Sequence, residues 1–159
     1  IRVFAFSKAY AMTGYRIGFV HTDAALISEM LKVHDGLVTC APVVSQYGAI
    51  AAFDYAEEEV LKFREEFLWR RGYIEERLNP LADKFSWHQP RSGYFLFPKV
   101  WRPDEELAWD ILKKAKVATV PGSAFGPGGE GHLRLCFGVS REVLEVALDR
   151  LTKYCEDVA

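Results

Sequence analysis

The chain begins with two apolar, β-prone segments, residues 1–6 and 16–21, with a Thr-Gly pair in the connection between them. Short continuous apolar runs bounded by turn residues are typical of strands that are covered on both faces. We therefore predict two buried strands of an α/β sheet. The residues that follow residue 6 would then lie just past the carboxyl end of a strand, where open α/β sheets bind ligands.

Helical periodicity begins after the second segment. Asp23 is a suitable N-cap for a helix that runs to about Val33, and Gly36 is a suitable end for it. A second helix is predicted over residues 43–53, directly after Pro42. This segment is so low in polarity that we expect it to be buried between elements or against a partner subunit.

A long third helix is predicted from Asp54 to Asn79-Pro80, with apolar residues at helical spacing. Short strands and helices then alternate, which is typical of an α+β domain. We place a domain boundary near residue 55, so that residues 1–55 end an α/β domain and residues 56–159 form a smaller α+β domain. The predicted elements of this second part are strands at 84–88, 93–97, 117–120 and 132–137 and helices at 104–115 and 141–156.

The connection after the first strand carries the first candidate site. Ser7 and Lys8 follow Phe6, and Arg16 comes eight residues after the lysine. A neutral lysine amine can form a Schiff base with an aldehyde, and an arginine offers a planar charged group to a phosphate. Pyridoxal phosphate carries both an aldehyde and a phosphate, so the pair predicts a site for this cofactor. A solvated strand end and a surface arginine are the alternative interpretation.

The strand predicted at residues 132–137 carries the second candidate site. Alternation along a strand puts Leu133, Leu135 and Phe137 on one face and Arg134 on the other. An arginine fixed on a rigid strand can bind a carboxylate through two parallel hydrogen bonds. The alternative is an arginine that is simply exposed to water.

Three ordered segments resemble signatures of the class I/II aminotransferases, which are fold-type I pyridoxal phosphate enzymes. They are Ser-Lys-Ala-Tyr-Ala-Met-Thr-Gly-Tyr-Arg-Ile-Gly at 7–18, Arg-Ser-Gly-Tyr-Phe-Leu-Phe-Pro at 91–98, and the stretch 120–135 with its glycine-rich loop. The resemblance implies that Lys8 is the catalytic residue that carries the cofactor, that Arg16 and Ser7 bind its phosphate, and that Arg134 binds the substrate carboxylate. One departure is Ala5, where many members have a further phosphate-binding serine.

The same resemblance implies the end of a fold-type I large domain followed by the small C-terminal domain. It also implies amino acid and 2-oxo acid substrates and a homodimer. Because members are much longer and the chain opens at Ile1 inside a strand, we expect a C-terminal portion that is inactive alone. The family's aspartate for the pyridine nitrogen would lie upstream.

Composition limits the kinds of partner that the chain can bind and the cellular compartment in which we expect it. The net charge of −2, with no basic stripe, argues against nucleic acid, and no apolar run is long enough to span a membrane. Cys40, Cys136 and Cys155 are odd in number and have no metal-ligand spacing, so we predict a reducing cytoplasm and no metal. His132 and Cys136 share a strand face but are too far apart to chelate one ion unaided.

Three other functions remain open at this point. A related fold-type I enzyme could perform elimination or cyclisation with the same lysine and arginine. An aminotransferase-like sensor domain of a transcription regulator would bind the cofactor without turning over a substrate. A fold without a ligand would explain the motifs by packing alone, although three ordered signatures would then be a coincidence.

Overall fold

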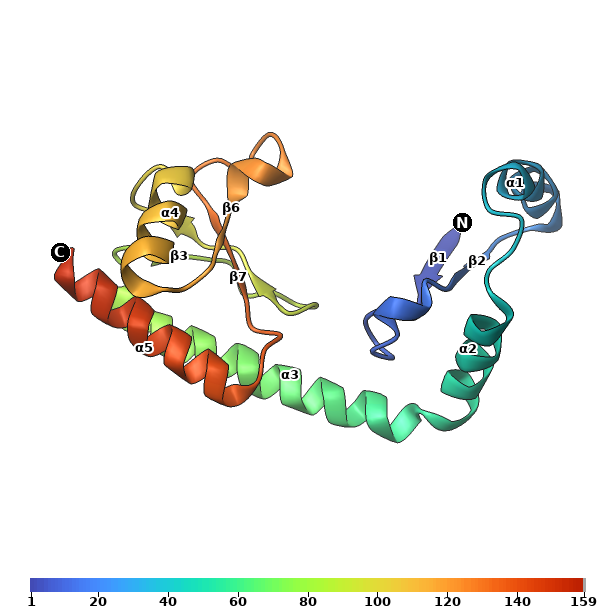
Figure 1. Ribbon diagram of the computed structural model, residues 1–159, viewed down its shortest axis with the longest axis horizontal. Coiled ribbons are helices and arrows are strands. Elements are labelled where there is room, and N and C mark those ends of the chain that lie inside the picture. Colours follow the sequence, from blue (N-terminus) through green and yellow to red (C-terminus); the bar gives the residue numbers. More distant parts are fainter. Residues whose placement is uncertain (159) are drawn as a thin grey trace. The chain divides into compact units, whose positions relative to one another are not determined.

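The computed structural model describes residues 1–158, and these residues form two compact units that divide between Glu65 and Glu66 (Figure 1). The division falls inside helix α3 (Glu57–Leu78), beyond the domain boundary near residue 55 that the sequence predicts. The predicted start at Asp54 is wrong, because Asp54 lies inside helix α2 (Val43–Tyr55) and α3 begins at Glu57, whereas its end immediately before Asn79-Pro80 is as expected.

Unit 1 opens with an antiparallel pair, β1 (Arg2–Ala5) and β2 (Gly18–His21), in which Arg2 is opposite His21 and Ala5 is opposite Gly18. Both strands were predicted, but the prediction that they are buried is wrong: β1 is exposed along its length, and Val3 is 75% exposed. The reason is that β1 and β2 pair only with each other within residues 1–158 and form a two-stranded sheet.

Helix α1 (Ala24–Leu37) begins as predicted, because the Asp23 side chain accepts a hydrogen bond of 3.0 Å from the backbone N–H of Leu26. Its predicted end is wrong, since Gly36 lies inside the helix. The last turn is closed instead by the N–H of Val38, which donates to the carbonyl of His34, and the chain then turns at Thr39 with φ of 65°.

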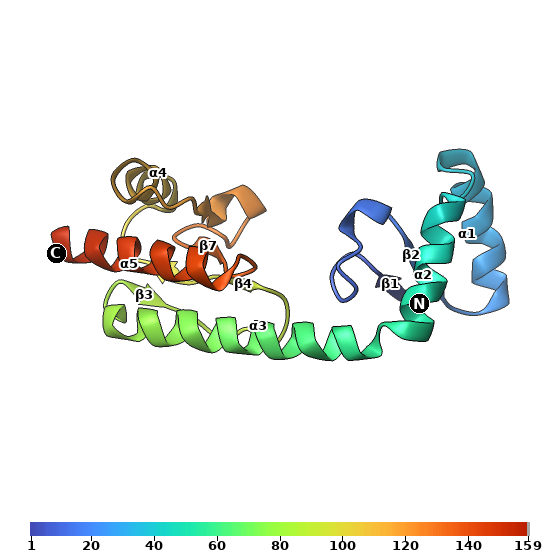
Figure 2. The same ribbon diagram turned by 60° about the horizontal axis from the view of Figure 1, so that its bottom comes forward.

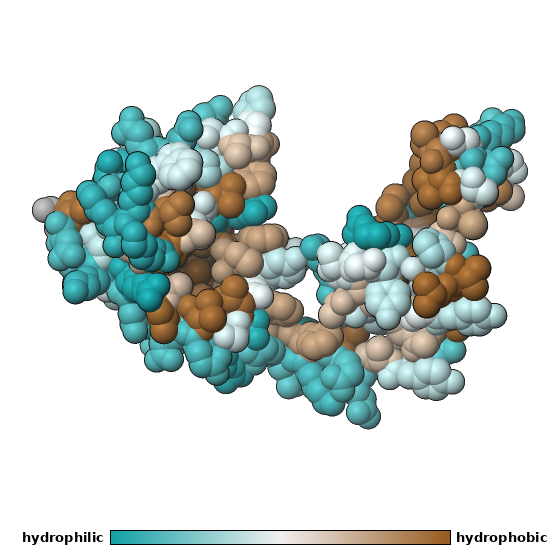
Figure 3. Space-filling view, in the orientation of Figure 1, coloured by the Kyte–Doolittle hydropathy of each residue, from teal (hydrophilic) through white to brown (hydrophobic). Residues whose placement is uncertain are grey.

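Helix α2 (Val43–Tyr55) buries only Ser45 and Ala49. The prediction that it is buried between elements of this chain is therefore wrong, whereas burial against a partner subunit stays a prediction. Apolar side chains also cover much of the surface of α1 (Figure 3). The larger exposed apolar residues of the two helices are Leu26, Met30, Leu31, Val33, Leu37, Val43, Val44, Tyr47, Ile50, Phe53 and Tyr55.

Unit 2 is the predicted α+β unit. Its larger sheet has the strand order β4-β7-β6, entirely antiparallel, and a separate pair joins β3 to β5. The strand pair includes β5, which the sequence pattern did not predict. The bounds are β3 (Phe85–Ser86), β4 (Phe95–Leu96), β5 (Lys99–Val100), α4 (Asp104–Ala115), β6 (Val120–Pro121), β7 (Leu133–Cys136) and α5 (Arg141–Asp157).

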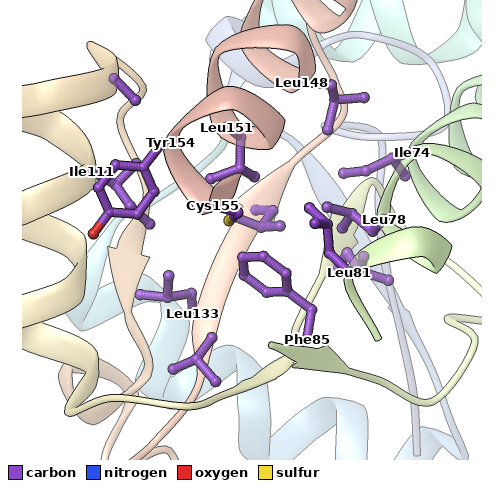
Figure 4. Packing of buried hydrophobic residues seen from close by; sticks show 14 of the residues in the cluster. Ile74, Leu78, Leu81, Phe85, Ile111, Leu133, Leu148, Leu151, Tyr154 and Cys155 are labelled. Carbon is purple, nitrogen blue, oxygen red and sulfur yellow. The ribbon is translucent and has the colours of Figure 1, made fainter. Parts of the chain in front are cut away.

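The core of unit 2 lies between its helices and the larger sheet. Helix α5 runs alongside the second half of α3 in both ribbon views (Figures 1 and 2), and residues from both helices meet Phe85 and Leu133 in the interior (Figure 4). Leu78, Leu107, Ile111 and Leu133 are fully buried. This core holds β7 rigidly, and β7 carries Arg134.

Candidate functional site

The predicted cofactor site is the connection between β1 and β2. The backbone N–H of Phe6 donates to the carbonyl of Ile17 over 3.2 Å, so the two ends of this connection are joined. Ser7 and Lys8 follow one end and Arg16 precedes the other. Ser7, Lys8 and Arg16, three of the four site residues predicted from the sequence, therefore belong to one closed loop.

Hydrogen bonds inside the loop fix its path. The Thr13 hydroxyl donates to the carbonyl of Ser7, and the Thr13 carbonyl accepts from Nη1 of Arg16, both over 2.9 Å. A third bond runs from the N–H of Ala11 to the carbonyl of Lys8. Thr13 thus links both phosphate-binding candidates, a role that sequence reasoning missed because it depends on how the loop folds back.

Helix α2 packs against the buried side chains of this loop. Phe6 and Met12 are buried against Ala49, and the ring of Phe6 meets that of Phe53 edge to face at 4.9 Å. Ser45, which is 4% exposed, donates a hydrogen bond of 2.7 Å to the carbonyl of Tyr15. The backbone is thereby held where Arg16 adopts a left-handed conformation, with φ of 51° and ψ of 46°.

The chemistry of this loop fits a phosphate-bearing aldehyde. Lys8 and Arg16 are exposed and Ser7 is half-buried. Residues 1–22 contain the basic side chains of Arg2, Lys8 and Arg16 and no Asp or Glu. One segment thus supplies an amine, a guanidinium and a hydroxyl, which are the groups that an anionic aldehyde requires.

Arg134 lies on β7 with its side chain between two aromatic rings. Its guanidinium carbon is 4.5 Å from the ring centre of Phe95 and 4.6 Å from that of Phe125. Leu133 and Leu135 are buried on the opposite face, so the predicted alternation is confirmed. An arginine in cation–π contact still has N–H groups that can donate to an acceptor.

The surroundings of Arg134 favour an anion. Across the described residues 1–158, no carboxylate or carbonyl accepts a hydrogen bond from its guanidinium. A half-buried arginine whose guanidinium has no such acceptor can offer two parallel N–H groups to a carboxylate. The aromatic pair was missed in the sequence analysis, because Phe95 and Phe125 are distant along the chain and only the fold joins them to Arg134.

Phe125 belongs to the glycine-rich loop between β6 and β7. A β-carbon on Gly122 would lie 2.1 Å from the carbonyl oxygen of Gly129, so the two sides of the loop touch through backbone that only glycine permits. The N–H of Gly122 also donates to the carbonyl of His132. The loop is therefore anchored to the start of β7, next to Arg134.

A cavity of about 590 Å³ also opens in unit 2. Apolar residues of α5, the segment 116–119 before β6, and Leu135 line it. None of the predicted site residues belongs to its lining, although Cys136, which shares a face of β7 with Arg134, does.

Within residues 1–158, no group of three or more His, Cys, Asp or Glu side chains is placed to hold a metal ion. None of the helices in the same range combines the length and the apolarity needed to cross a bilayer.

Comparison with known proteins identifies the family of this chain. The family described as "Aminotransferase class I and II" matches residues 2–151. A putative aminotransferase YugH of Bacillus subtilis is 38% identical over 94% of this chain and 39% of that protein. An aspartate aminotransferase of Pyrococcus abyssi is 36% identical over 96% of this chain and 40% of that protein.

The same holds for solved structures. An aromatic aminotransferase from Pyrococcus horikoshii superposes with a TM-score of 0.90 at 33% identity, over 98% of this chain and 42% of that one. The chain thus spans about two fifths of the length of these relatives. The prediction of an α/β segment followed by an α+β unit of the aminotransferase fold is confirmed, and the chain belongs to the class I and II aminotransferase family.

Proposed function

We propose that this chain is part of a pyridoxal phosphate-dependent aminotransferase that transfers an amino group between an amino acid and a 2-oxo acid. The observation that carries the proposal is the closed loop of residues 6–17, which holds Lys8 and Arg16 in an acid-free segment. The names of its relatives support the reaction class, since they include aspartate and aromatic-amino-acid aminotransferases.

In this proposal Lys8 holds the cofactor through its aldehyde, while Arg16 and Ser7 hold the phosphate. Pyridoxal phosphate, when bound, supplies an electron sink for negative charge that develops at the substrate's α-carbon. Arg16 suits the phosphate because Thr13 already fixes one edge of its guanidinium and leaves other N–H groups for oxygen acceptors. Ser7 supplies a hydroxyl donor at the same end of the loop.

Proton transfer falls to the side-chain nitrogen of Lys8. As a neutral amine, Nζ removes a proton from the substrate's α-carbon, and as an ammonium it returns the proton to the accepting carbon. Arg134 binds the substrate carboxylate through two N–H groups, and the rings of Phe95 and Phe125 keep the guanidinium plane in one orientation. Lys8 therefore moves protons and Arg134 orients the substrate.

Reductive trapping tests the cofactor site. The chain is mixed with pyridoxal phosphate, reduced with borohydride and digested, and the labelled peptide is mapped. We expect the label on Lys8 and its loss in Lys8→Ala, whereas Lys32→Ala on α1 is the matched control and keeps it. A label on another lysine, or equal labelling of Lys8→Ala, would contradict the proposal.

A second measurement concerns activity. Because the chain spans about two fifths of its relatives, we propose that it binds the cofactor weakly and turns over slowly on its own. Amino-group transfer between aspartate and 2-oxoglutarate, followed alongside release of pyruvate from serine, separates a transferase from a lyase. Rapid transamination by this chain alone would contradict the proposal of low activity.

We also propose that the whole protein is a cytoplasmic homodimer. The exposed apolar residues of α1 and α2 support an interface, and three free cysteines support a reducing compartment. Sedimentation of the whole protein at several concentrations tests the dimer, and a monomer at all of them would contradict it.

A further inference from the structure

Asp104 is a buried carboxylate at the start of α4, only 7% exposed. Its oxygen Oδ2 accepts a hydrogen bond of 2.8 Å from the N–H of Ser123, and Oδ1 accepts one of 3.2 Å from the N–H of Gly131. These two donors stand near opposite ends of the glycine-rich loop. One side chain from another element therefore ties both ends of this loop.

The loop between these two donors needs such a restraint. Gly126, Gly128 and Gly131 have φ of 97°, 88° and 69°, conformations that glycine adopts readily and other residues rarely adopt. A segment so rich in glycine loses much conformational freedom when it is ordered. The loop carries Phe125, which is half exposed and contacts the ring of Phe97 and the guanidinium of Arg134.

The two rings around Arg134 differ in how they are supported. Phe95 is part of β4 and pairs with Cys136 of β7, so the sheet itself fixes this ring. Phe125 is held by its edge-to-face contact with Phe97 and by the loop, in which Ser123, two residues away, is bound by Asp104. On the Phe125 side, the contact between ring and guanidinium therefore depends on the path of the loop and on the Asp104 contacts.

We propose that Asp104 is a positioning residue for carboxylate binding: by holding Ser123 and Gly131, it keeps Phe125 against Arg134 and sets the plane of the guanidinium. The inference rests on the proposed role of Arg134 as the carboxylate anchor. Hydrogen bonding, chiefly from the Ser123 N–H, also lowers the pKa of Asp104 to about 2, so the carboxylate is charged at neutral pH and accepts both bonds.

The test measures carboxylate binding at Arg134 by NMR on the isotope-labelled 159-residue chain. Pyruvate, a 2-oxo acid with one carboxylate, is the probe, and the Arg134 Nε–H resonance is the reporter. We expect Asp104→Asn to weaken binding about tenfold, because an amide cannot accept from both N–H groups as the carboxylate does. Glu105→Gln, which removes the adjacent exposed acid of the same helix turn, is the matched control and leaves binding unchanged.

A second variant separates positioning from folding. Phe125→Leu keeps Asp104 and removes only the exposed ring, so it should weaken pyruvate binding without changing the amide resonances of Leu133 and Phe137 in the core. The ring-current shift of the Arg134 side chain, measured without pyruvate, should be reduced in both Asp104→Asn and Phe125→Leu.

Two results would overturn the inference, and they differ in what else they remove. In the first, the wild-type chain binds pyruvate at Arg134, and Asp104→Asn or Phe125→Leu binds it with the same affinity. This result overturns the role of Asp104 and leaves the carboxylate anchor in place. No response of Arg134 to pyruvate in the wild-type chain overturns the anchor itself, and the inference with it.

Discussion

Arg141, the first residue of α5, binds Glu66 of α3 through both carboxylate oxygens, with distances from its Nε of 3.0 and 3.2 Å. Arg70 reaches the same carboxylate from one helical turn further along α3, and the Arg141 guanidinium lies 4.0 Å from the ring centre of Trp69. The pair joins the two long helices of unit 2 near the point where β7 leads into α5.

Replacing Glu66 should loosen this junction. Glu66→Gln removes the charge that two arginines share, so we expect a lower Tm, with a smaller difference at high salt because exposed ion pairs are screened. Thermal unfolding followed by circular dichroism measures it. Glu65→Gln changes the preceding exposed acid and should leave Tm unchanged; equal effects of both variants would contradict the pairing.

Acid should destabilise unit 2. Hydrogen bonds from Arg141, the Ser123 N–H and Tyr154 lower the pKa values of Glu66, Asp104 and Asp110, respectively, to about 2. Since unfolded carboxyl groups titrate near pH ~4, this stability is present above that pH and is lost as the pH falls toward 2. Denaturant unfolding between pH 5 and pH 2 should show the decline, and a constant free energy of unfolding over that range would refute it.

The core of unit 2 should be intolerant of truncation. Leu133→Ala removes a fully buried side chain of β7 and should lower the free energy of unfolding by about 2–5 kcal/mol. Val143→Ala, at an exposed position of α5, should change it by less than about 0.5 kcal/mol. Urea titrations of the two variants and the wild type give the comparison, and similar losses in both would contradict the burial.

Gly122→Ala should disturb the glycine-rich loop. The new β-carbon would lie 2.1 Å from the carbonyl oxygen of Gly129, so the backbone has to move and Phe125 with it. We expect weaker pyruvate binding at Arg134, measured by NMR titration. Gly72→Ala, on α3 with nothing within 4 Å of the new carbon, should keep binding and stabilise the helix by about 0.5–1 kcal/mol.

Much of this fold could be predicted because local signals determine it. Asp23 and Ser140 cap helices through their own side chains, and alternation along β7 separates Leu133 from Arg134. The end of α1 could not be predicted, because the interior of a helix tolerates a glycine such as Gly36 when a later residue closes the last turn.

The candidate site was predicted in its charged residues but not in its supports. Lys8 and Arg16 stand out in the sequence. The supporting roles depend on hydrogen bonds to backbone atoms that only the fold brings near, as for Thr13, Ser45 and Asp104. In the sequence, Asp104 looks like any acidic residue in the first turn of a helix, a position that the helix dipole favours. Only the fold distinguishes it from Glu105 and Glu106.

The uneven charge of the chain has a kinetic consequence. The net charge is −2, yet the first 22 residues hold three Lys or Arg side chains and no Asp or Glu, so this segment carries a charge opposite in sign to the total. A phosphorylated ligand would be steered toward this end, and its association should accelerate as ionic strength is lowered. Stopped-flow mixing at two salt concentrations would reveal that acceleration, and a salt-independent rate would show that no such field guides the encounter.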